Sequence, residues 1–296
     1  MWYSIRFLLL AITYFLLLFN LNFNEMKKLF YYHKWKLIVS IIIPLLAICV
    51  FYSCSKGTKC FNDESYLTEI AKYDFIGKLH NEGLMYIHDA IKLKTKSGEI
   101  TKDNITPEFL FELTKEYING LDYPQSTKTI ANKSINAIDI QILTKTKTDS
   151  PLSDLSPDAV ILAEKILTAF DNYDEQFDST IQSVEIEAID ILDETEEYAI
   201  LAEASVARNT SEYWQQNFDS WLDSVSIETK TLDDIDWGEV GGSDAFGAIT
   251  MAANMIASGT MAALIAAGPP GWTAIGLALA ASAIVASSIS LMFMIY

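Results

Sequence analysis

Apolar residues recur at helical spacing through most of the chain between residues 61 and 230. The two clearest stripes are Ile181, Val184, Ala188, Ile191 and Leu192, and then Trp214, Phe218, Trp221 and Val225. Positions three or four residues apart lie on one side of a helix, and an apolar side of this kind packs against a core. The pattern therefore predicts an all-α fold, and we assign the stripes to its core rather than to a ligand-binding surface.

Polar and turn-forming residues mark where some of these helices begin and end. In "TPEFLFELTKEYING", Thr106 is placed to cap a helix, Pro107 suits the first turn and Asn119-Gly120 indicates the end. The segment "TKTDSPLSDLSPD" interrupts the pattern, and Ser156-Pro157-Asp158 begins a new helix. We expect two acidic helical subdomains, over residues 61–149 and 156–230.

The last 52 residues, 245–296, contain no charged side chain. The runs Ala245–Gly268 and Trp272–Tyr296 would each extend about 36 Å as helices, enough for a hydrocarbon core of about 30 Å. Ser243 or Asp244 is placed to cap the first run, and the turn between the runs is predicted at Gly268, Pro269, Pro270 and Gly271. The chain is therefore expected to end in a hydrophobic helical hairpin.

Small residues form rows at four-residue spacing along both predicted arms. They are Gly259, Ala263 and Ala267 on the first arm, and Ala274, Ala278, Ser282, Ala286 and Ser290 on the second. Such rows let helices approach closely in lipid, so we expect the arms to pack on each other or on further copies of the chain. The alternative is a hairpin buried in the domain core or self-associating outside a bilayer. The missing polar face argues against a core hairpin.

Charge divides the chain into three regions. The whole chain has a net charge of −18, but residues 1–60 have a net charge of +6 and residues 61–244, with 38 acidic and 14 basic residues, have −24. Such an acidic region would repel phosphates, so nucleic-acid binding is not expected.

The N-terminal region has the layout of an export signal. Counted from Met26, a basic segment is followed by the apolar "LIVSIIIPLLAICV" and then "FYSC". The ending "VFYSC" resembles a bacterial lipoprotein signal, which implies lipidation of Cys54. Residues 26–54 would then be the signal, and residues 1–25 an upstream misreading. If translation instead begins at Met1, residues 1–25 contribute an extra membrane segment and residues 26–54 a membrane anchor, with a positively charged cytoplasmic loop between the two apolar runs. Both interpretations place the acidic region outside the cytoplasm.

Two further segments carry resemblances. "YDFIGKLHNEGLMYI" resembles uncharacterised envelope proteins of Bacteroidetes-type bacteria, which implies a helical secreted domain. "DIDWGEVGGSDAFGAI" is similar to the double-glycine junction of small membrane-permeabilising bacteriocins, although here 240 residues precede Gly241 and Gly242. We interpret residues 231–244 as a hinge around Gly241 and Gly242.

Candidate chemistry is sparse. His80 and His88 would lie about 12 Å apart on one helix, too far to share a metal ion, and "DNYDEQFD" lacks the spacing and glycine of a calcium loop. His80 and Asn81 are interpreted either as a contact between helices or as a ligand contact. We predict no metal, no cofactor and no enzymatic activity.

These features predict an exported, membrane-associated protein of the bacterial cell envelope, lipid-anchored at Cys54. Its partners would be membrane lipid and further copies of itself through the C-terminal hairpin. The alternative is a bacteriocin-like protein that permeabilises membranes, with the acidic domain keeping the hairpin soluble until insertion.

Overall fold

The computed structural model describes residues 63–101, 104–138, 151–171, 173, 175–224 and 237–295. Every regular element in these ranges is a helix, which confirms the all-α fold. The elements are α4 (Asp63–Ala71), α5 (Asp74–Lys96), α6 (Pro107–Gly120), α7 (Gln125–Asn136), the 3-10 helix η2 (Pro151–Asp154), α9 (Pro157–Asp171), α10 (Phe177–Ile191), α11 (Glu194–Ser224), α12 (Trp237–Ala257), α13 (Thr260–Ala266) and α14 (Pro269–Ile295).

Local capping explains where two of the helices begin. The Thr106 hydroxyl accepts a hydrogen bond from the Phe109 N–H at 3.3 Å, and Pro107 occupies the first turn of α6, as the sequence predicts. The Ser156 hydroxyl likewise accepts from the Ala159 N–H at 3.3 Å at the start of α9. The side chain of Glu196 accepts hydrogen bonds from the N–H and hydroxyl of Ser156, which ties this helix start to α11.

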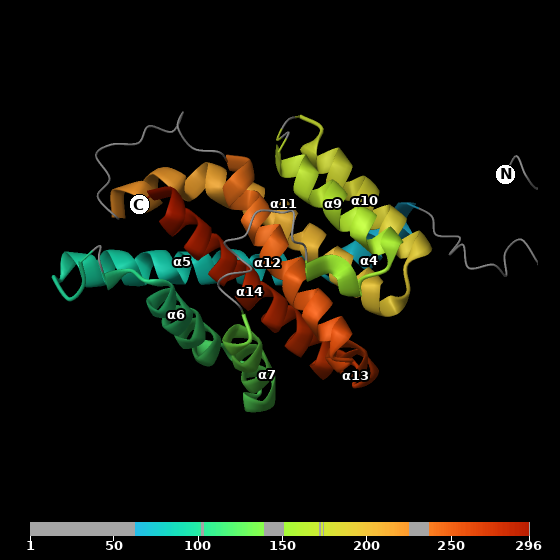
Figure 1. Ribbon diagram of the computed structural model, residues 1–296, viewed down its shortest axis with the longest axis horizontal. Helices are drawn as coiled ribbons and strands as arrows, with labels where there is room; N and C mark the ends of the chain where they lie inside the picture. The colour runs from blue at the N-terminus through green and yellow to red at the C-terminus, as the bar shows by residue number, and fades with distance from the viewer. Residues whose placement is uncertain are drawn as a thin grey trace, which may run out of the picture. The chain divides into compact units, whose positions relative to one another are not determined.

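The helix α14 is the centre of the bundle. It contacts α5, α6, α7, α11, α12 and α13, and in Figure 1 it runs between α12 and the pair formed by α6 and α7. The helices α9 and α10 pack on α11, and α9 also contacts α12. Residues 59–296 form one compact unit, so the expected separation into two acidic subdomains and a distinct hairpin is not observed.

Burial of α14 explains why it lacks a polar face. Every residue from Ala274 to Ile289 is buried. A helix that is apolar on all sides belongs either in the interior of a protein or in a membrane, because no side of it favours water. The expectation that a core hairpin needs a polar face was wrong for this helix, because it is surrounded by other helices.

The first arm of the predicted hairpin is not one continuous helix. The helix α12 begins at Trp237, eight residues before the predicted start, so Ser243 and Asp244 lie inside it and are not caps. It ends at Ala257, and α13 follows at an angle of 86°. Gly259 occupies the left-handed region with φ of 69°, the conformation in which glycine commonly ends a helix.

The predicted rows of small residues have different surroundings. Four residues of the α14 row, Ala274, Ala278, Ser282 and Ala286, are buried, and Ser290 is half-buried. On the other arm, Gly259, Ala263 and Ala267 are exposed, so that row does not pack against α14.

Gly247 of α12 makes the close contact with α14 instead. The Ser282 hydroxyl donates to the Gly247 carbonyl at 2.8 Å, and a Cβ built on Gly247 would lie 2.6 Å from the Cβ of Ala286. The two helices therefore pack through small residues, as predicted, but at a different position on α12.

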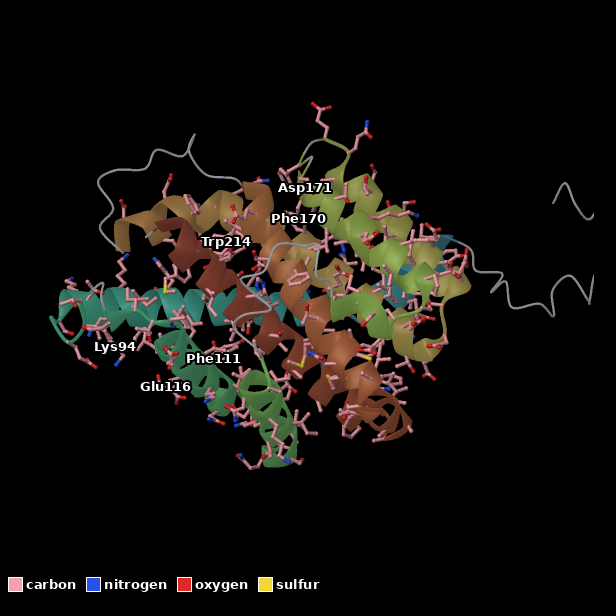
Figure 2. All side chains as sticks on the ribbon, viewed as in Figure 1. Lys94, Phe111, Glu116, Phe170, Asp171 and Trp214 are labelled. Carbon is pink, nitrogen blue, oxygen red and sulfur yellow. The ribbon has the colours of Figure 1, made fainter. Side chains whose placement is uncertain are left out.

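The turn and the hinge also differ from the prediction. Gly268, with φ of 73°, makes the turn, whereas Pro269 and Pro270 already form the first turn of α14, where proline is tolerated. Gly241 and Gly242 lie within α12 rather than in a hinge. A Cβ on Gly241 would overlap the ring of Phe170, which α9 directs towards α12 (Figure 2).

The predicted N-terminal features lie outside the described residues. These are the extension at residues 1–25, the signal or anchor at residues 26–54 and the lipidation site Cys54.

Candidate functional site: a buried polar node

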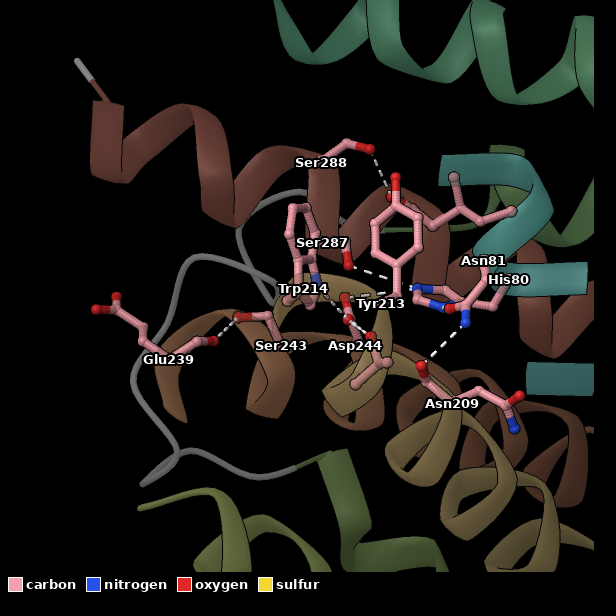
Figure 3. Close-up of polar contacts among 12 residues, drawn as sticks. His80, Asn81, Asn209, Tyr213, Trp214, Glu239, Ser243, Asp244, Ser287 and Ser288 are labelled. Atoms are coloured by element: carbon pink, nitrogen blue, oxygen red, sulfur yellow. Dashed lines mark hydrogen bonds and ion pairs between the residues drawn. The ribbon is translucent and has the colours of Figure 1, made fainter. Parts of the chain in front are cut away.

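Four helices meet at a group of polar side chains inside the apolar core, which we call the polar node (Figure 3). Its members are His80 from α5, Thr210 and Trp214 from α11, Asp244 from α12 and Ser287 from α14. Each of them is buried, with at most 2% of its surface exposed. Polar groups at this depth stabilise a fold only when they bond one another, because burial removes their hydrogen bonds to water.

Asp244 is the acceptor at the centre of the polar node. Thr210 and Trp214, one helical turn apart on α11, both direct donors at Asp244 Oδ2: the Thr210 hydroxyl and the Trp214 Nε1–H, the latter at 2.9 Å. The other oxygen, Oδ1, lies 3.6 Å from His80 Nε2 and accepts no hydrogen bond from the described residues. The carboxylate therefore joins α12 to α11 and faces α5.

The orientation of His80 follows from its neighbour Asn81. The Asn81 Nδ2 donates to the Asn209 carbonyl at 2.9 Å, which turns its Oδ1 towards His80 Nδ1 at 3.0 Å. A carboxamide oxygen only accepts, so Nδ1 carries a proton, and in the neutral imidazole Nε2 is the acceptor. The Ser287 hydroxyl, 3.5 Å from Nε2, is placed to donate to it and connects α14 to the polar node.

The polar node does not have the geometry of a nucleophilic triad. In a triad the serine and the carboxylate approach opposite nitrogens of the imidazole. Here Ser287 and Asp244 both face Nε2, and Nδ1 faces Asn81. Because the side chains are also closed off from solvent, this conformation gives a substrate no route to them. The arrangement is suited to holding four helices together.

Two further buried acids lie outside the polar node. Glu203 of α11 is fully buried, neither carboxyl oxygen has a hydrogen-bond partner among the described residues, and burial raises its pKa well above the usual value.

Glu185 of α10 is buried against Arg208 of α11. Burial raises the pKa of Glu185 to about 7, although the guanidinium opposes the shift. Arg208 Nη2 lies 2.9 Å from Glu185 and 2.8 Å from Asp74 of α5, so one cation joins three helices.

The structure places the predicted candidate residues in helix contacts. His80 and Asn81 connect α5 to α11 and face α12 and α14. His88 has a separate environment, with its Nε2 2.9 Å from the Ser220 carbonyl and its ring 4.9 Å from that of Trp221. Across the residues that the structure describes, no three His, Cys, Asp or Glu side chains are grouped to hold a metal ion.

Sequence reasoning missed Asp244 as a core residue. It is the last charge before the uncharged C-terminal region, which made it resemble a helix cap. One signal was present: Thr210 and Trp214 lie on the mainly apolar side of this helix, and a buried indole N–H requires an acceptor.

Comparison with known proteins adds no relatives. The chain matches no family model, no curated protein and no solved structure. The class of protein is therefore defined by its own fold: an all-α bundle around a long uncharged helix, with a buried polar node joining that helix to its surroundings.

Proposed function

We propose that this protein acts on membranes by releasing α14, together with α12 and α13, from the bundle into a lipid bilayer. One observation carries the proposal: a helix without charge, long enough to span a bilayer, lies at the centre of an acidic bundle and is enclosed by other helices. The proposed class is a non-enzymatic, membrane-permeabilising protein.

Length and charge support insertion. Pro269–Met292 is long and apolar enough to cross a membrane, and α12 and α13 would supply a second span if the bend between them straightened. Asp244 precedes Gly268 by 24 residues, which is about 36 Å along a straight helix. With the turn at one membrane surface, the carboxylate would therefore lie near the opposite surface, where a charge is tolerated far better than at the bilayer centre.

The contacts of α14 also support the proposal. Its apolar side chains lose little by exchanging the core for lipid, because hydrocarbon tails are as apolar as the residues they replace. Polar contacts that oppose release include the Ser287–His80 pair and the hydrogen bond from the Tyr198 hydroxyl to the Trp272 carbonyl at 2.8 Å. By contrast, the bond between Ser282 and Gly247 joins α14 to α12 and would move with both helices.

A disulfide between α5 and α14 tests whether release is required. Ile284 Cγ1, whose place a cysteine Sγ would take, lies 3.0 Å from a Cβ built on Gly83. Because Cγ1 is bonded to the Cβ of Ile284, the two Cβ atoms are at most about 4.5 Å apart, which is the upper end of the spacing of about 3.5–4.5 Å found in disulfides. The variant Gly83→Cys with Ile284→Cys, made in a chain whose native cysteines are replaced by serine, would therefore tie α14 to α5.

The assay is release of an entrapped dye from phosphatidylcholine vesicles. We expect release by the wild-type chain, loss of release in the oxidised variant and recovery when the same sample is reduced. Ile284→Cys alone, treated with the same oxidant, is the matched control and should release dye. Equal release by the oxidised and reduced variants would contradict a requirement for α14 to leave the bundle, and no release by the wild-type chain would contradict the function itself.

Export to the cell envelope and lipidation of Cys54 are separate parts of the proposal. They are supported by the basic and apolar layout of residues 26–54. Intact-mass analysis of membrane-extracted protein should find an acylated Cys54 at the N-terminus, and an unmodified Met1 terminus would contradict the lipid anchor.

A further inference from the structure

One part of the uncharged C-terminal region remains exposed in the folded bundle. This surface, which we call the tip, comprises α13 and the turns on both sides of it. Its exposed residues are Ser258, Gly259, Thr260, Ala262, Ala263, Ala266, Ala267, Pro269, Pro270 and Trp272. In Figure 1, α13 lies at the end of α12 and α14 where the chain passes from one to the other.

The tip is held in shape by contacts within the fold. Gly259 and Gly268, both with positive φ, bend the chain on either side of α13. At Gly271 the start of α14 passes so close to the Leu264 carbonyl that a Cβ would overlap it. The tip is therefore a built surface rather than a loose loop.

The solvent-exposed part of the Trp272 side chain is apolar. The residue is 40% exposed, although its only polar side-chain atom, Nε1, donates to the Ile265 carbonyl at 3.2 Å. The hydrogen bond leaves the exposed part of the indole without a polar group to hydrate. Tryptophan with this amphipathic placement is enriched at the boundary between water and lipid.

Charge identifies the kind of surface that the tip would meet. Residues 61–244 have a net charge of −24, whereas the tip has none. The acidic part of the protein repels anionic headgroups, and the tip has no cation to attract them. A bilayer of neutral, zwitterionic lipid fits both properties.

We propose that the tip docks the folded protein on a zwitterionic lipid surface before α14 enters it. The inference rests on the proposed function for its purpose, because the tip includes the first residues of the span Pro269–Met292. Docking through the tip brings the turn of the proposed hairpin to the bilayer while α14 is still buried. Docking and release are therefore separate steps.

The experiment measures flotation of the oxidised Gly83→Cys/Ile284→Cys protein with phosphatidylcholine vesicles. Because α14 is tied to α5, binding does not involve its release, and the tip substitutions distinguish docking through the tip from vesicle binding by the apolar N-terminal runs. We expect the tied protein to float with the vesicles without releasing dye. Adding Ala263→Glu and Ala267→Glu, which place two carboxylates on exposed positions of the tip, should reduce the bound fraction by about tenfold, since charged groups are disfavoured where apolar side chains enter the interface.

A matched pair of substitutions tests whether weaker vesicle binding depends on the position of the added carboxylates rather than on their charge alone. Leu93→Glu and Ile191→Glu lie at exposed positions of α5 and α10, 70% and 49% exposed, and should leave vesicle binding unchanged. Vesicles that contain phosphatidylglycerol should bind the tied protein more weakly at low salt than at high salt, because salt screens the repulsion. Thermal unfolding of each variant checks that the bundle is intact.

The outcomes separate the two proposals. Binding by the tied protein without dye release after reduction would leave docking in place and contradict the release of α14. Dye release after reduction without vesicle binding by the tied protein would contradict docking and leave the function in place. If the tip substitutions instead convert a dimer into a monomer and do not change vesicle binding, the tip contacts a second copy of the chain and the docking proposal is wrong.

Discussion

Replacing Glu185 with glutamine should change how the stability of the bundle depends on pH. Glu185 lies on α10 with 2% of its surface exposed, faces Arg208 of α11 and lies near Asp74 of α5. Burial raises its pKa from 4.5 to about 7. Between those two values the folded state holds a proton that the unfolded chain has released, so stability falls as the pH rises through this window.

The pKa difference sets the magnitude. One pKa unit is equivalent to about 1.4 kcal/mol, so this residue alone lowers the free energy of unfolding by roughly 3 kcal/mol between pH 4.5 and pH 7. The raised pKa of Glu203 acts in the same direction. Urea unfolding followed by circular dichroism, at several pH values from about 5 to about 8 at constant ionic strength, measures the dependence.

Glu185→Gln cannot titrate, and its amide oxygen still accepts from Arg208. We therefore expect a flatter pH dependence, with the variant gaining stability relative to wild type as the pH rises. The matched substitution Glu187→Gln, at a side chain of α10 that is 42% exposed, should retain the wild-type dependence. Parallel curves for wild type and Glu185→Gln would refute the assignment of this proton uptake to Glu185.

Three further substitutions test the packing, the polar node and a helix cap. Gly77→Val should lower the free energy of unfolding, measured by urea unfolding, by about 2 kcal/mol or more, because a Cβ would overlap the Ser205 carbonyl where α5 crosses α11. The control is Gly120→Ala, because a Cβ built on Gly120 meets no neighbouring part of the fold within 4 Å. Asp244→Ala leaves the Trp214 and Thr210 donors unpaired and should lower the free energy of unfolding by about 3 kcal/mol. Dye release from vesicles should be faster. Unchanged stability would contradict the role given to the polar node. Thr106→Ala removes the cap of α6 and should cost about 1 kcal/mol, measured as a lower Tm.

The parts of the fold that depend on local chemistry could be predicted from the sequence. Apolar residues at helical spacing identified core positions such as Val184 and Trp214, and Thr106-Pro107 identified the start of α6, because caps and amphipathic faces depend on neighbouring residues. The bend at Gly259 was also visible in principle. Gly259 was interpreted as a packing residue, although a glycine in the left-handed conformation ends a helix.

Features that depend on distant residues could not be predicted. The composition of α14 suits the interior of a bundle and the interior of a bilayer equally, because both environments exclude water. The helices that surround α14 decide which environment it occupies. One of them, α5, lies about 200 positions earlier in the sequence, so the local pattern around α14 does not reveal it. The partners of Asp244, 30 and 34 positions away on α11, were hidden for the same reason.

The central position of α14 determines when the chain can fold. The pair formed by His80 and Ser287 joins residues 207 positions apart, and closing so long a loop costs entropy before any contact compensates for it. While the polypeptide is being made, α5, α6, α7 and α12 emerge before the helix on which all four pack. A nascent chain that ends before residue 269 therefore exposes the groove that α14 later fills, so the bundle is completed only after synthesis has passed that point.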